Sequence, residues 1–158
     1  GYFESPLGKA IVRRPGKDVT VVANSYLVAE SLKAADFLER HGIQIEIVDP
    51  VSLVPLDRKT IVDSVCKTGR LLVLDTSWMT CGVSAEIAAV AAEDAFDALK
   101  QPVRRMGNQP VPCPVSKPLE NLFYPTAKTI AAAVGEMLAK DLPLQDAPVL
   151  TNKFKGPF

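Results

Sequence analysis

Residues 18–23 read DVTVVA, a β-branched and mostly apolar run that is closed by Asn24-Ser25. Such a run is typical of a strand that is buried on both faces of a sheet. From Ser25, apolar side chains recur at helical spacing as far as His41-Gly42, where glycine suits the left-handed residue that ends a helix. The stretch therefore predicts a buried strand followed directly by a helix.

The same alternation repeats along the chain. It predicts strands at 43–48, 70–75 and 102–106, a helix from Asp57 to Gly69, a helix over 83–91 and a last helix after 124–126. Strands that alternate with helices imply right-handed crossovers and a largely parallel sheet covered on both faces. We predict a three-layer α/β/α fold with a largely parallel sheet of about five strands.

The ends of the chain and one internal stretch depart from this alternation. Residues 102–125 hold six of the 13 prolines, so 110–114 should be an extended connection and no central strand. We expect residues 1–10 to be a linker from a missing upstream domain and 11–140 to be the domain. Residues 141–158 should form an extended C-terminal tail that orders only against a partner, with Phe154 and Phe158 as apolar anchors.

The composition excludes several classes of partner. Hydrophobic residues make up 47% of the 158, enough for one core, and 18 basic residues balance 18 acidic ones. We therefore expect no nucleic-acid or membrane partner, and no apolar run approaches the ~20 residues that would span a bilayer. Three well-separated cysteines lack metal-binding spacing and suggest a reduced, cytoplasmic protein.

Few residues suggest chemistry. A Ser or Cys nucleophile usually needs a histidine, and His41, the only one, stands at a helix end, where a capping or surface role is expected. Cys81 precedes a predicted helix, which favours a reactive thiolate, but we interpret it as a small packing residue. The turn around it, residues 80–84, could cradle an anion, although it has one glycine only.

Two acids and a tryptophan mark the ends of predicted strands. Asp49 and Asp75 follow parallel strands, at the edge where open α/β sheets bind ligands, yet turn and cap roles account for both. Trp78 could be either a core residue or an interface anchor. From the residues alone we therefore assign no catalytic, cofactor-binding or metal-binding residue.

Several motifs together resemble a known family. Most specific is SVCKTGRL at 64–71, which matches the family pattern S-V-x-K-T-x-R-L; PLGKA at 6–10, EIVD at 46–49 and GVSAEI at 82–87 are also similar. The chain resembles the C-terminal domain of transketolase-like thiamin-diphosphate enzymes, nearest to the β subunit of 2-oxoacid dehydrogenases of the pyruvate or branched-chain type. Cys81, Ser84 and Pro110 depart from residues common in that family, which puts the subfamily and substrate in question.

The resemblance implies a division of labour. The intact enzyme would decarboxylate a 2-oxoacid and pass the acyl unit to a lipoyl group, using thiamin diphosphate and Mg²⁺ held by other domains. This domain would support oligomer contacts, between β subunits and with an α subunit, and its C-terminal region could dock the acyltransferase component. It would bind no cofactor alone and would be inactive in isolation. Trp78, Phe154 and Phe158 are the interface residues we expect.

Other functions stay open. The domain could come from a transketolase or a deoxyxylulose-phosphate synthase, which would not acylate a lipoyl domain. It could be a free-standing interaction module that dimerises through apolar helix faces. A small flavodoxin-like enzyme or binder is the third alternative, which the lack of a glycine-rich phosphate loop disfavours.

Overall fold

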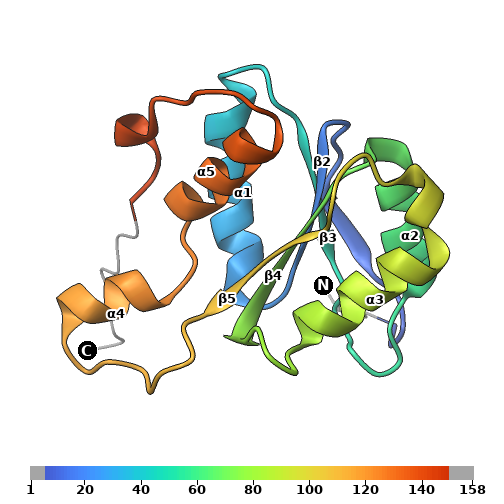
Figure 1. Ribbon diagram of the computed structural model, residues 1–158, viewed down its shortest axis with the longest axis horizontal. Helices are drawn as coiled ribbons and strands as arrows, with labels where there is room; N and C mark the ends of the chain where they lie inside the picture. The colour runs from blue at the N-terminus through green and yellow to red at the C-terminus, as the bar shows by residue number, and fades with distance from the viewer. Residues whose placement is uncertain (1–5, 150–158) are drawn as a thin grey trace, which may run out of the picture.

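The computed structural model describes residues 6–149, in which five strands and seven helical segments form an α/β domain (Figure 1). The strands are β1 (Ile11–Arg14), β2 (Val19–Ala23), β3 (Ile45–Asp49), β4 (Leu71–Trp78) and β5 (Arg104–Asn108). The α-helices are α1 (Tyr26–Glu39), α2 (Arg58–Thr68), α3 (Val83–Asp94), α4 (Lys117–Phe123) and α5 (Ala127–Met137). Two 3₁₀ turns follow α3 and α5, η1 (Phe96–Ala98) and η2 (Leu144–Asp146).

The sheet has the order β1-β3-β2-β4-β5. β2 pairs in parallel with β3 and β4, β4 pairs in parallel with β5, and only β1 is antiparallel to its neighbour β3. β2 lies at the centre, and all five of its residues are buried, as the apolar run at 18–23 predicts. The largely parallel five-stranded sheet is confirmed.

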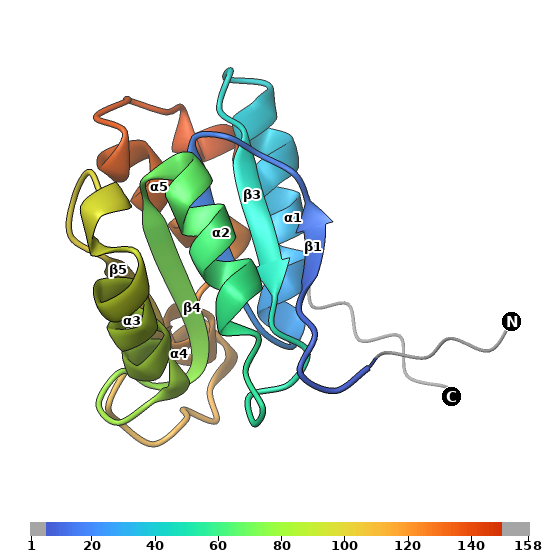
Figure 2. The same ribbon diagram turned by 90° about the vertical axis from the view of Figure 1, so that its right-hand side faces the viewer.

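Helices cover both faces of the sheet, α1 and α5 on one and α2 and α3 on the other (Figures 1 and 2). Successive strand residues point to opposite faces, so Val21 joins the core under α1 and α5 while Val22 joins the core under α2 and α3. The three layers predicted from the alternation of strands and helices are therefore present.

Local signals set the ends of α2 as the sequence predicts. The Asp57 carboxylate accepts a hydrogen bond from the backbone N–H of Thr60 at 3.2 Å, which satisfies a donor of the first turn. Gly69 ends the helix at φ 73°, a backbone conformation that costs glycine nothing.

Two elements were not predicted. β1 has only four residues and pairs on one side, and α4 lies in the proline-rich stretch 102–125, which was predicted to be a long connection without a helix. In α4, however, Pro118 stands in the first turn, where a missing N–H breaks no helical bond. Residues 109–116, just before α4, form no helix or strand, as expected for 110–114.

Residues near the ends of the described chain pack on the domain. In 141–149, assigned to the tail from the sequence, Ala147 is buried and Leu142 and Leu144 pack against the core beneath α1 and α5. Across that core, the buried carboxylate of Glu30 on α1 accepts a 2.9 Å bond from the backbone N–H of Ala127, at the start of α5. The first and last α-helices are thus bonded to each other.

Among residues 6–149, no helix combines the length and apolar character that crossing a membrane requires.

Candidate functional site

The carboxyl ends of β2, β3, β4 and β5 lie together at the lower end of the sheet in Figure 1. Open α/β sheets commonly bind ligands at this end. Asp49 is the last residue of β3, whereas Asp75 lies inside β4, because that strand extends to Trp78, beyond the predicted end at residue 75. The sequence thus correctly places both acids near this end.

Asp75 is a buried cap. One carboxylate oxygen accepts the backbone N–H of Ser77 at 3.0 Å, and the other accepts that of Ser84 at 2.8 Å. Ser84 is in the first turn of α3, where unpaired N–H groups and the helix dipole favour a negative charge. The expected cap role is confirmed, and both oxygens are engaged in it.

Asp49 accepts a hydrogen bond within a turn and forms an ion pair. Its Oδ1 accepts the backbone N–H of Val51 at 3.0 Å, and its Oδ2 accepts the Nη2 of Arg13 at 2.7 Å. The expected turn role is therefore confirmed, with an added bond to β1. Because both acids already have partners, nothing in this geometry favours acid/base catalysis by either.

The turn before α3 offers no cradle for an anion. The Asp75 carboxylate already accepts an N–H of the first turn, so a second negative group would meet like charge. Gly82 is needed there for space, since a Cβ would lie 2.2 Å from the Trp78 carbonyl oxygen. Cys81 is exposed, so the packing role expected for it is wrong.

His41 has the helix-end role expected from its position. Its Nδ1 lies 2.9 Å from the carbonyl oxygen of Phe37, and the two rings lie 4.6 Å apart between centroids. Within residues 6–149, no group of three or more His, Cys, Asp or Glu is placed to hold a metal ion.

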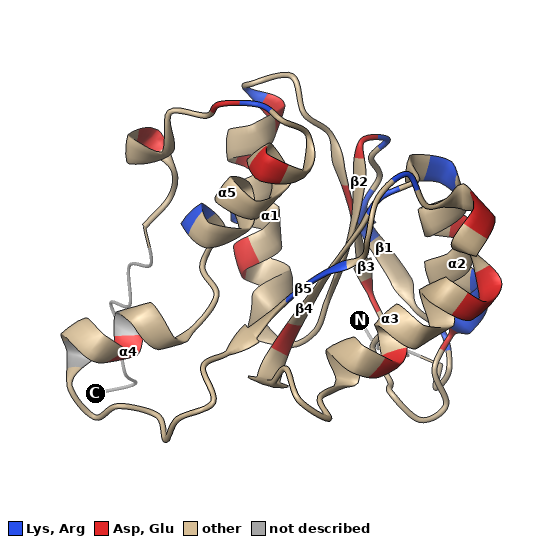
Figure 3. Ribbon diagram, in the orientation of Figure 1, with Lys and Arg blue, Asp and Glu red and all other residues tan. Residues whose placement is uncertain are grey.

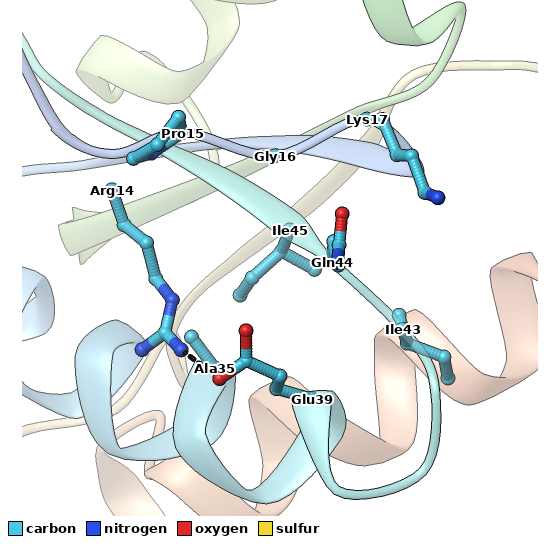
Figure 4. A pocket seen from close by; sticks show the side chains of 9 residues that line it. All are labelled: Arg14, Pro15, Gly16, Lys17, Ala35, Glu39, Ile43, Gln44 and Ile45. Atoms are coloured by element: carbon cyan, nitrogen blue, oxygen red, sulfur yellow. Dashed lines mark hydrogen bonds and ion pairs between the residues drawn. The ribbon is translucent and has the colours of Figure 1, made fainter.

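The opposite end of the sheet has a hollow of about 370 Å³ (Figure 4). It is lined by Arg14, Pro15, Gly16, Lys17, Ala35, Glu39, Ile43, Gln44 and Ile45. The Arg14 guanidinium is paired with Asp36 at 2.5 Å and with Glu39 at 2.8 Å. With that cation neutralised by two acids, Lys17 is the other cation of the lining, and a single lysine beside Glu39 does not make an anion site.

The family-like stretch 64–71 has a structural role that the sequence did not reveal. Glu46 on β3 is 3% exposed, and its carboxylate accepts the Ser64 hydroxyl at 2.6 Å and pairs with the Lys67 ammonium. The Ser64 hydroxyl also bonds Thr20, which in turn bonds Thr68. These bonds fix α2 to the sheet. The available signal in the sequence was an acid placed between two apolar residues, Ile45 and Ile47, in the middle of a predicted strand.

Hydrogen bonding governs the pKa of Glu46. Burial alone would raise this pKa, but hydrogen bonds from Lys67, Ser64 and the Gly16 N–H outweigh it and hold the pKa below its usual range. The carboxylate is therefore charged at neutral pH, as its pairing with Lys67 requires.

Trp78 belongs to an exposed apolar surface. Its side chain is 54% exposed, which excludes the core alternative, and it lines a shallow hollow of about 340 Å³ together with the turn at 80–82. Large apolar side chains are exposed in or beside the connections at this end, namely Leu7, Val51, Leu53, Val54, Trp78, Met79, Val111, Val115, Leu119 and Leu122. Phe154 and Phe158, the other interface residues expected, lie outside the described residues.

The connections that follow the parallel strands carry almost no charge. Residues 24–25, 50–57, 76–82 (the end of β4 and the turn after it) and 109–116 contain one charged residue, Asp57, the cap of α2, and we call the surface they form the apolar end (Figure 3). At the other end, which we call the charged end, each connection contains a charged residue; these are 15–18, 40–44, 69–70 and 95–103. Neutral connections with exposed large apolar side chains are typical of a surface that is covered in an assembly.

Comparison with known proteins identifies the family. Residues 8–130 match the family described as transketolase, C-terminal domain. The chain belongs to this family. The resemblance inferred from the motifs is thus confirmed, and the parallel sheet and its helices are those of a transketolase C-terminal domain.

Its relatives are β subunits of longer enzymes. The chain is 39% identical over 139 residues to the acetoin:2,6-dichlorophenolindophenol oxidoreductase subunit beta of Bacillus subtilis (strain 168), covering 88% of this chain and 41% of that protein. It is 41% identical over 145 residues to the mitochondrial pyruvate dehydrogenase E1 component subunit beta of Pisum sativum, covering 92% and 40%. This transketolase C-terminal domain thus spans about two fifths of the length of these relatives.

A solved structure agrees with this assignment. A chain described as a split gene transketolase, inactive beta4 tetramer, superposes with a TM-score of 0.76 at 32% identity, covering 87% of this chain and 44% of that one. The fold and the family thus rest on both sequence and structure.

Proposed function

We propose that this chain is the C-terminal domain of the β subunit of a thiamin-diphosphate-dependent 2-oxoacid dehydrogenase, in which it supplies assembly contacts. The observation that carries the proposal is the apolar end. Where many α/β enzymes hold a ligand, this domain has nearly uncharged connections, exposed apolar side chains and two acids that are already bonded. Such a surface suits contact with protein more than reaction with a small substrate.

The reaction of the intact enzyme is inferred from the relatives. One is named a pyruvate dehydrogenase E1 component subunit beta, and the stretch 64–71 follows the motif of that group. We therefore propose oxidative decarboxylation of a 2-oxoacid, with transfer of the acyl unit to a lipoyl group.

The cofactor would be held elsewhere in the intact enzyme. Thiamin diphosphate needs donors for a diphosphate and ligands for Mg²⁺, and the described residues include no acidic cluster for the metal. The N-terminus of α3, which could attract a phosphate, is capped by Asp75. These residues do not fit the cofactor, so no step of the reaction is assigned to them.

The partners we propose are a second β subunit and an α subunit, both meeting the apolar end through Trp78 and α4. Leu119 and Leu122 on α4 are exposed and three residues apart, which places them on one face of the helix. Docking of an acyltransferase component near residues 150–158 is a further proposal. Unchanged affinity for that component after deletion of these residues would remove it.

Calorimetric titration of thiamin diphosphate and Mg²⁺ tests the division of labour. We expect no heat of binding with this 158-residue chain and clear binding with the full-length β subunit combined with its α subunit. Tight binding by the 158-residue chain alone would contradict the proposal and would return attention to Asp49 and Asp75.

A transketolase is the second candidate, favoured by the similar split gene transketolase structure. A lipoyl-domain acylation assay on the full-length enzyme separates the two, because only the dehydrogenase uses that acceptor. Ketol transfer between sugar phosphates without lipoyl acylation would favour the transketolase.

The cytoplasmic location expected from the sequence also stays a proposal. The Pisum sativum relative is named mitochondrial. Fractionation of source cells, followed by detection of the full-length protein, would decide between the two compartments.

A further inference from the structure

The segment that enters the domain runs beside the connection between β3 and α2, at one side of the apolar end (Figure 2). The backbone N–H of Gly8 donates to the Ser52 hydroxyl at 2.8 Å, and that of Ala10 donates to the Asp57 carboxylate at 3.0 Å. The Ser52 hydroxyl in turn donates to the Pro55 carbonyl at 2.8 Å. Residues 8–10 are thus bonded to the connection 50–56 and to the cap of α2.

Close packing holds the same two segments together. Gly8 has φ 72°, and a Cβ on it would lie 2.9 Å from the Cγ of Pro55, so a side chain at this position would be strained and crowded. Ala10 packs against the core beneath α2 and α3, as does Leu56. The direction in which the chain reaches the domain is therefore fixed by bonds and packing.

An apolar patch surrounds this entry point. Its members are Leu7, Val51, Leu53 and Val54, and Val54 is 92% exposed. None of them contributes to the core of this domain. We call these four residues the entry patch.

We propose that the entry patch is the contact surface for the domain that precedes residue 6 in the same polypeptide. The inference rests on the proposed function only in taking the chain as part of a longer β subunit. The relatives are long enough for such a domain, since this chain covers about two fifths of them. Any polypeptide that precedes residue 6 must leave the domain beside Leu7, and so next to Val51, Leu53 and Val54.

Tethering favours this occupant over a second copy of the chain. A neighbour joined through a short linker is present at an effective concentration on the order of millimolar, so a modest apolar contact suffices to hold it. The four side chains of the patch are uncharged, and the exposed charge beside them, Lys9, belongs to the entering segment itself, so recognition at the patch would depend on apolar contact. The rest of the apolar end, around Trp78 and α4, is left for contacts with other subunits.

Hydrogen exchange on the full-length β subunit and on this 158-residue chain tests the proposal. We expect the backbone amides of residues 52–54 to exchange at least about tenfold more slowly in the full-length protein. The protection should persist when the full-length protein is diluted until it is monomeric. Equal rates in the two proteins would overturn the proposal, and protection that disappears on dilution would assign the patch to a second subunit.

A variant sharpens the test. Val54→Asp should remove the protection of residues 52–54 in the full-length protein and leave the unfolding midpoint of the 158-residue chain unchanged, because the side chain is exposed here. Val149→Asp, at another exposed valine outside the entry patch, is the matched control and should keep the protection. Protection that survives Val54→Asp would contradict the proposal. If the full-length variant fails to fold, the wild-type comparison still decides, and neither result depends on whether the enzyme acylates a lipoyl domain.

Discussion

The two ends of the sheet hold their charges in opposite ways. At the charged end, Arg14 pairs with Asp36 and Glu39, whose side chains are mostly exposed. At the apolar end, Asp75 is buried under the turn it caps. The acidic side chains that pair with Arg14 are thus exposed to solvent, whereas the Asp75 carboxylate is buried. The difference indicates which end was free to become a contact surface, because interface centres are depleted of charged residues.

The largest expected effect comes from breaking the buried cap of the apolar end. Asp75→Ala leaves the N–H groups of Ser77 and Ser84 without their acceptor, which should lower the free energy of unfolding by about 2 to 4 kcal/mol. Urea unfolding of the 158-residue chain measures this loss. Asp97→Ala, at an exposed position of η1, is the control, and equal small losses in the two variants would contradict the cap's importance.

A smaller effect should follow from removing the cation that neutralises Glu46. Lys67→Met leaves the buried carboxylate with Ser64 and Gly16 as donors, and should lower the free energy of unfolding by about 1.5 to 3 kcal/mol at pH 7. Lys59→Met, which removes an exposed pair with Asp63 on the same helix, is the control and should leave the unfolding midpoint unchanged.

The same variant predicts a change in pH dependence. The pKa of Glu46 is lower in the folded protein than in the unfolded chain, so its stabilisation is present above the unfolded pKa of about 4.3 and is lost as pH falls through the folded pKa. In Lys67→Met this acid-dependent loss should be smaller. Without the Lys67 ammonium, the pKa of Glu46 in the folded protein rises towards its value in the unfolded chain. Parallel stability curves for the two proteins between pH 7 and pH 3 would contradict this assignment.

The smallest effect in free energy concerns assembly. Leu122 is 78% exposed on α4, so Leu122→Asp should leave the stability of the 158-residue chain within about 0.5 kcal/mol. In the full-length protein it should weaken subunit association by roughly tenfold, or about 1.4 kcal/mol, as measured by sedimentation. Phe96→Asp, at an exposed phenylalanine of the charged end, should leave association unchanged. The reverse pattern would mean that the wrong end was assigned to assembly.

The sequence predicted the elements whose burial is set locally. The apolar run at 18–23 could only be a central strand, and Asp57 and Gly69 set the limits of α2 through bonds within a few residues. β1 was not predicted because it is short and because its one partner strand, β3, lies more than 30 residues further along the chain. α4 was not predicted because it has only seven residues and lies in the proline-rich stretch that was predicted to be a connection; Pro118 is tolerated in its first turn.

The candidate site was harder to predict than the fold. Trp78 was singled out, but the rest of the apolar end comes from four connections that are distant in sequence and meet only because their strands are parallel. The signal was nevertheless present, since the segments that follow the predicted parallel strands, 24–25, 49–57, 76–82 and 107–116, contain only two charged residues, Asp49 and Asp57. Glu46 was missed as a buried acid because its partners, Ser64 and Lys67, lie on the next helix.

The bond between Glu30 and Ala127 has a consequence for synthesis on the ribosome. Glu30 leaves the ribosome early, but the backbone N–H that its carboxylate accepts arrives 97 residues later. Until then the Glu30 carboxylate has the nearby Lys33 ammonium as its partner but lacks the bond to α5, so burial of that face of α1 would be unfavourable. The layer formed by α1 and α5 can therefore close only when nearly the whole domain has been made, which gives nascent chains a long interval in which the central strands are uncovered on that side.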